Sequence, residues 1–86
     1  MEPGNNRAFG LALRKLRLRA GITQDRLAML ADMDRSHISM LERGKRSPTL
    51  DTMISICRGL DLRLPLLAEA VEAALHQADP FRTHKG

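Results

Sequence analysis

The chain has 86 residues, a formal net charge of +4, no Trp or Tyr, and two Phe residues. This length favours one small domain, and the scarcity of aromatic rings disfavours a reader of single-stranded nucleic acid, which stacks bases on such rings. A modest basic excess with few aromatics favours duplex DNA as a partner, because phosphates attract charged side chains rather than rings.

The single cysteine, Cys57, cannot form an internal disulfide, so the fold does not depend on an oxidising compartment. Cys57 occupies a periodic apolar position, which indicates a small core residue rather than a redox sensor. The apolar runs are too short to cross a membrane, and the N-terminus does not resemble a signal peptide. We therefore expect a cytoplasmic protein with no membrane partner.

Apolar residues recur three and four positions apart along most of the chain, and this spacing predicts helices. Residues 1–6 are expected to form a flexible lead, and a first helix follows and ends at Gly21. Thr23 is expected to cap a short second helix, and Asp34 a third over residues 35–43. No strand alternation is present, so an all-α fold is expected.

Two further helices are predicted beyond a basic loop at residues 45–48, where a proline disfavours helical geometry. Thr49 is expected to cap the fourth helix. Pro65 suits the first turn of a fifth helix that continues to about Gln77. Residues 79–86 show no periodicity and are expected to form a flexible tail.

The segment from Thr23 to Pro48 has the dimensions of a helix-turn-helix: a short capped helix, a three-residue turn and a second short helix. Ala28 is small enough to let the two helices cross closely. Met33 and Ile38 have the spacing of a hydrophobic staple, which fixes the direction in which the third helix leaves the turn.

Five submotifs in this order and spacing resemble the Xre family of Cro-like and lambda-repressor-like helix-turn-helix proteins. They are Gly21-Ile22-Thr23-Gln24, Leu27-Ala28, Ile38-Ser39, Leu41-Glu42-Arg43-Gly44 and Pro48-Thr49-Leu50. The resemblance covers about residues 9–63 and implies a five-helix fold whose third helix enters the major groove. We expect residues 7–63 to form the helix-turn-helix DNA-binding domain and residues 64–78 a C-terminal helix. The resemblance also implies a pair between Arg17 and Glu42 that ties the first helix to the third.

Three residues depart from the family pattern. The family often has Gly where this chain has Asp32 and Asp61, and Asp tolerates left-handed backbone better than most residues. It often has Glu where Arg26 stands, so a capping box with Thr23 is not formed. We expect these departures to affect stability more than DNA contacts.

The third helix is predicted to turn Ile38 and Leu41 toward the core, and its other face is therefore available to DNA. Arg35 lies at the N-terminal end, where its guanidinium would bind O6 and N7 of guanine with two hydrogen bonds. The predicted base-reading residues are Arg35, Ser36, His37 and Met40.

Phosphate contacts are expected beside that helix. The free backbone N–H groups at the start of the second helix form an anion site, and the resemblance also places Gln24 on the DNA backbone. The predicted phosphate-binding residues are Thr23, Gln24, Ser39, Arg43, Lys45, Arg46, Ser47 and Thr49.

The fifth helix, within residues 64–78, carries an apolar surface wider than one small core needs, and we expect part of it to bury against a second copy of the chain. The predicted dimer-interface residues are Leu66, Ala70, Ala73 and Ala74.

The chain is not expected to be an enzyme. Three His and one Cys lie on separate segments without zinc-ligand spacing, so no metal is expected, and the glycines do not form a phosphate loop that would bind a cofactor. The resemblance implies a homodimeric regulator of transcription, a repressor or a protein that touches RNA polymerase, on a two-fold-symmetric operator. The size and C-terminal helix also resemble controller proteins of restriction–modification systems. An antitoxin that neutralises a partner protein is the alternative.

Overall fold

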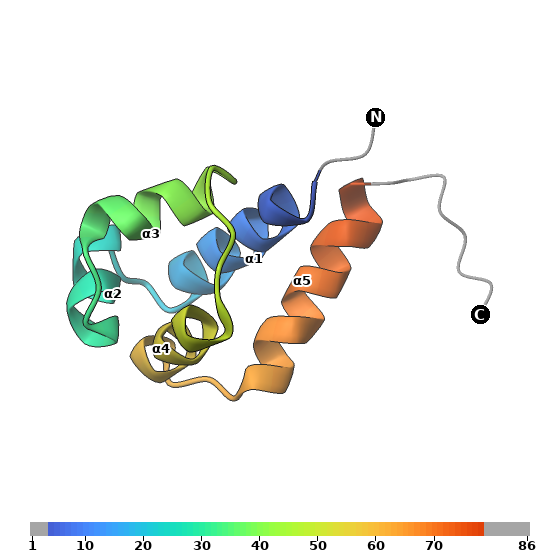
Figure 1. The fold of residues 1–86 in the computed structure, drawn as a ribbon. Coiled ribbons are helices and arrows are strands. Elements are labelled where there is room, and N and C mark those ends of the chain that lie inside the picture. Colours follow the sequence, from blue (N-terminus) through green and yellow to red (C-terminus); the bar gives the residue numbers. More distant parts are fainter. Residues whose placement is uncertain (1–3, 79–86) are drawn as a thin grey trace.

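The computed structural model describes residues 4–78, which form five helices (Figure 1). The helices are α1 (Asn5–Arg19), α2 (Gln24–Ala31), α3 (Arg35–Glu42), α4 (Leu50–Leu60) and α5 (Leu64–Ala78). Residues 4–78 contain no strand, and the predicted all-α, five-helix fold is confirmed. Helix α1 begins inside the segment expected to be a lead, while residues 1–3 and the expected tail, 79–86, lie outside the described residues.

Two threonines cap their helices as expected. Thr23 Oγ1 accepts a hydrogen bond of 3.0 Å from the backbone N–H of Arg26, and Thr49 Oγ1 accepts one of 3.0 Å from that of Thr52. Asp34 also occupies a cap position with extended backbone, but its side chain makes no capping hydrogen bond. The expectation for Asp34 was therefore right about where α3 begins and wrong about the side-chain bond.

Two helices end on an aspartate instead of the glycine common in the family. Asp32 after α2 and Asp61 after α4 adopt left-handed backbone, with φ of 58° and 57°. This conformation costs about 1–2 kcal/mol for most L-residues, and a short polar side chain tolerates it better. The two departures from the family pattern are thus accommodated without a change of fold.

Helix α1 lies between α3 and α5, and α2 packs against α3 and α4 (Figure 1). The side chains in the centre come from all five helices, and the largest that are fully buried are Leu13, Leu27, Ile38, Leu41, Ile56 and Leu67. Gly10 lets α1 approach the end of α3 closely, because a Cβ at this position would lie 2.5 Å from the carbonyl oxygen of Glu42.

No helix in the described part of the chain is long and apolar enough to cross a membrane.

Candidate nucleic-acid interface

Helices α2 and α3 form the helix-turn-helix motif, joined by a turn at residues 32–34. The backbone N–H of Met33 donates a 2.8 Å hydrogen bond to the carbonyl oxygen of Ala28, which closes the end of α2. Ile38 and Leu41 are fully buried, as expected, and Met33 packs against the same core. One face of α3 is thus fixed in the core while the other faces solvent.

The predicted base-reading residues lie on or beside this solvent face. Arg35 and Ser36, in the first turn of α3, are exposed, while His37 and Met40 are half-buried. Arg35 has one partner, Asp25 of α2, whose carboxylate Oδ1 lies 3.3 Å from Arg35 Nε. Sequence reasoning did not single out Asp25, because residues ten apart on two helices share no periodic signal.

Apart from Gln24 and Ser39, the predicted phosphate-binding residues fall into two groups. The polar groups of Thr23, Ser47 and Thr49 already have partners within the protein: the two threonines cap their helices, and Ser47 Oγ donates a 2.9 Å hydrogen bond to Asn6 Oδ1. This contact ties the basic loop to the first turn of α1. Sequence reasoning had placed Asn6 at the end of the flexible lead, as a possible helix cap, and not in contact with this loop.

The second group consists of basic side chains without an ion-pair partner among the described residues. Arg43, Lys45 and Arg46 are exposed at the end of α3 and in the loop that follows, and they form no ion pair within residues 4–78. Ser39, one turn earlier on α3, is half-buried. Three unpaired cations next to the exposed face of α3 make this edge of the motif suited to a polyanion.

A buried ion pair connects the motif to α1. Arg17 and Glu42 meet through Nε and Oε2 at 2.6 Å and through Nη2 and Oε1 at 3.1 Å, and their side chains are 8% and 2% exposed. The hydrogen bond to Glu42 raises the pKa of Arg17 above its ordinary value, against the opposite effect of burial. The pairing implied by the family resemblance is confirmed.

Gln24 joins this network from the first residue of α2. Its Nε2 donates a 3.0 Å hydrogen bond to Glu42 Oε1, which uses one of the two N–H groups of the amide. The backbone N–H groups of Gln24 and Asp25 have no hydrogen-bond partner among the described residues. The start of α2 thus presents free donors beside an amide whose orientation is held by Glu42.

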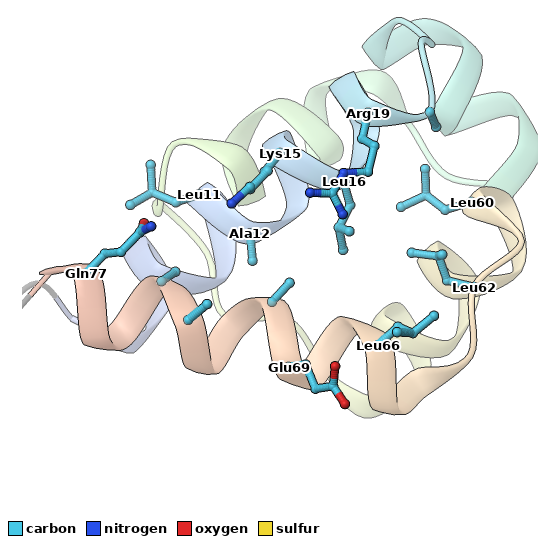
Figure 2. Close-up of a pocket in the computed structure, with 14 residues that line it drawn as sticks. Leu11, Ala12, Lys15, Leu16, Arg19, Leu60, Leu62, Leu66, Glu69 and Gln77 are labelled. Atoms are coloured by element: carbon cyan, nitrogen blue, oxygen red, sulfur yellow. The ribbon is translucent and has the colours of Figure 1, made fainter. Parts of the chain in front are cut away.

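The predicted dimer-interface residues lie along a groove of about 520 Å³ between α1 and α5 (Figure 2). Leu66 is 47% exposed, Ala73 is exposed, and Ala70 is half-buried against the core. Ala74 is only 6% exposed, so it packs mainly within its own domain and has little surface for a second chain. Figure 2 shows Lys15 on the α1 side of the groove and Glu69 on the α5 side.

Within residues 4–78, no cluster of His, Cys, Asp or Glu is arranged to hold a metal ion. Cys57 is buried, and this burial raises the pKa of its thiol. The interpretation of Cys57 as a small core residue is confirmed by its place among the core side chains.

Comparisons with known proteins agree with this geometry. A helix-turn-helix family matches residues 13–67. Control protein C.MunI from Mycoplasma sp. is 35% identical over 65 residues, 74% of this chain and 88% of that protein. The restriction–modification controller protein C.AhdI from Aeromonas hydrophila is 35% identical with a TM-score of 0.70, covering 72% of this chain and 94% of that one.

A point mutant of the restriction–modification controller protein C.Esp1396I superposes with a TM-score of 0.83 at 29% identity, covering 92% of this chain and all (100%) of that one. A match over more than half of the chain, together with relatives above 30% identity, establishes the family. The chain therefore belongs to the Xre-type helix-turn-helix family: it is a DNA-binding transcriptional regulator, not an enzyme, and it is similar to restriction–modification controller proteins.

Proposed function

We propose that the protein binds duplex DNA sequence-specifically as a homodimer, with α3 in the major groove of each half-site. The observation that carries this proposal is the division of α3 into two faces. Ile38 and Leu41 anchor one face in the core, and the other exposes Arg35 in its first turn, while three cations without an ion-pair partner among the described residues follow the C-terminal end of the helix. A helix presented in this way has the geometry of a recognition helix.

Base reading belongs to the exposed first turn of α3. Arg35 would read guanine through O6 and N7, and Ser36 would hydrogen-bond either type of base. Met40 offers apolar contact to a thymine methyl group, and His37 would reach a base or a phosphate according to the tilt of the helix. The partial burial of Met40 and His37 supports smaller roles for them than for Arg35.

Phosphate binding is proposed at both ends of the motif. At the start of α2, the free backbone N–H groups and the second amide N–H of Gln24 would hold one phosphate, helped by the helix dipole. Arg43, Lys45 and Arg46 would bind the backbone at the other end. The hydroxyls of Thr23 and Ser39 would contribute secondary contacts, and those of Ser47 and Thr49 would do so by exchanging their present acceptors, Asn6 and Thr52, for a phosphate.

A second copy of the chain is the proposed occupant of the α1–α5 groove. Its apolar floor includes Leu66, and its two sides carry opposite charges, with Lys15 on α1 and Glu69 on α5 (Figure 2). In a two-fold dimer the same surface meets itself, so each acidic side would face the basic side of the partner. The chain thus has both apolar area and complementary charge for self-association.

The dimer has a direct test, because α4 carries exposed apolar side chains that do not line this groove. Leu50 and Ile54 of α4 are 58% and 41% exposed. We expect Leu66→Glu to give a monomer in sedimentation at micromolar concentration, and Ile54→Glu to remain dimeric. The reverse pattern, or a monomeric wild-type chain, would refute the proposed interface.

We propose transcriptional control of restriction–modification genes as the biological role, since C.AhdI and C.Esp1396I are restriction–modification controller proteins. The protein would act in the cytoplasm by occupying an operator and by contacting RNA polymerase there. Selection of duplexes from a random library should enrich a two-fold-symmetric sequence with half-sites about 10 base pairs apart. Enrichment of no sequence would contradict the proposal.

The role of Arg35 is tested on the enriched site. Arg35→Ala should weaken binding by about 1–3 kcal/mol and remove the preference for guanine at one position of each half-site. An unchanged base preference would exclude Arg35 as a base reader. Other residues of α3 would then have to make the base contacts.

A further inference from the structure

An exposed ion pair joins the first turns of the two motif helices. Asp25 is the second residue of α2 and Arg35 the first of α3, and Arg35 Nε lies 3.3 Å from Asp25 Oδ1. The two side chains are 61% exposed for Arg35 and 78% exposed for Asp25. The pair therefore lies in solvent, at the end of α3 that is proposed to meet the bases.

The contact engages one atom of the guanidinium and leaves the others available. Nη1 and Nη2 carry four of the five N–H donors of an arginine. Those of Arg35 have no hydrogen-bond partner among the described residues. An arginine held at Nε still presents this terminal fork, which matches the paired acceptors O6 and N7 of guanine.

The helix dipole favours a carboxylate in the first turn of α2, as it does at Asp51 in the first turn of α4, but it does not account for the contact with Arg35. Exposed ion pairs contribute little to folding, because solvent screens them and both side chains lose freedom. Next to the phosphate-binding start of α2, a negative charge also opposes binding to DNA of any sequence. Residues 24–43, which span the motif, already contain four acidic and three basic residues, so this cost to affinity is not offset within the motif.

We propose that Asp25 is a specificity-determining residue that positions the Arg35 guanidinium for reading guanine. This inference rests on the proposed function, with α3 in the major groove. Ordering the Arg35 side chain before binding removes part of the entropic cost of the base contact, which corresponds to about 2- to 10-fold in discrimination. The same carboxylate should weaken binding to unrelated DNA by about twofold at low salt.

The test compares three duplex oligonucleotides at one salt concentration. The first is the site that the wild-type protein enriches from random duplex DNA, the second has the Arg35-dependent G·C pair changed to A·T, and the third is unrelated in sequence. The variant is Asp25→Asn, and its matched control is Asp51→Asn. Asp51 is likewise the second residue of a helix capped by a threonine, and it forms no ion pair within residues 4–78.

We expect Asp25→Asn to lower the ratio of affinities for the first and second duplexes by about 2- to 10-fold and to raise the affinity for the third about twofold. Asp51→Asn should keep the ratio of the wild-type protein. When Arg35→Ala is already present, Asp25→Asn should no longer change the ratio, because there is no guanidinium to position.

Three results would overturn the proposal. A wild-type ratio in Asp25→Asn would show that Asp25 does not position Arg35, and a higher ratio would show that the pair withholds Arg35 from DNA. An equal loss in Asp51→Asn would trace the effect to net charge. Failure of the proposed function is recognised separately, since the wild-type protein itself would then not distinguish the duplexes, and this result overturns the inference with it.

Discussion

Replacement of Glu42 by Ala should destabilise the domain by about 3–5 kcal/mol, because it leaves the guanidinium of Arg17 buried without its carboxylate. The wild-type pair has N–O contacts of 2.6 and 3.1 Å, and the Arg17 side chain is 8% exposed. After the substitution Arg17 keeps one hydrogen bond, from Nη1 to the carbonyl oxygen of Ile22. An arginine cannot lose its proton to escape this environment, so the charge stays buried.

The size of this effect is large for so small a domain. Stability of about 0.05–0.15 kcal/mol per residue corresponds to about 4–13 kcal/mol for the whole chain. Glu42→Ala thus removes a large part of the free energy of unfolding. Glu42→Gln keeps an acceptor oxygen and loses the charge, so we expect a smaller loss of about 1–3 kcal/mol, which keeps the test informative if the alanine variant is largely unfolded.

Urea unfolding followed by far-ultraviolet circular dichroism is the suitable assay, because the chain has no Trp or Tyr to report by fluorescence. The control is the double variant Arg17→Met with Glu42→Leu, which replaces both charges by apolar side chains. Buried pairs replaced in this way often keep or gain stability, so we expect a value within about 1 kcal/mol of wild type or above it. A loss below about 1 kcal/mol in Glu42→Ala, or a double variant no more stable than Glu42→Ala, would refute this reasoning.

Three further outcomes are expected. Gly10→Ala should cost about 1–3 kcal/mol, despite the higher helix propensity of Ala, because the new Cβ would lie 2.5 Å from the Glu42 carbonyl oxygen; a more stable variant in urea would contradict the close approach. Lys45→Ala should weaken binding to all duplexes and reduce the slope of log K against log salt by about one unit, and an unchanged slope would mean that Lys45 contacts no phosphate. The raised pKa of buried Cys57 means that the unfolded thiol ionises first, so the contribution of this thiol to stability should be constant below the ordinary value of 9.0 and fall as the pH rises above it; a Cys57→Ala variant should show a smaller alkaline decline in urea unfolding.

The candidate site could be predicted from the sequence where position along one helix decides exposure. Arg35 and Ser36 are exposed because Ile38 and Leu41, two to six residues later, occupy the buried face. The hydrogen bond from Ser47 to Asn6 could not be predicted, because the two residues are 41 positions apart in the sequence. The sequence does not show whether a polar side chain has a partner within the protein, because folding alone brings distant partners together.

The sequence by itself determined the order of five helices, the two threonine caps, the left-handed ends at Asp32 and Asp61, and membership of the family. The helices, caps and left-handed ends depend on residues within one or two helical turns, and family membership depends on the order and spacing of short submotifs, so all of them follow from spacing and residue type. Only the tertiary structure decided that Ala74 packs inside its own domain and that Gln24 and Asp25 orient toward Glu42 and Arg35. Those contacts join different helices, and they exist only because the crossings of α1, α2, α3 and α5 bring distant residues within a few ångströms.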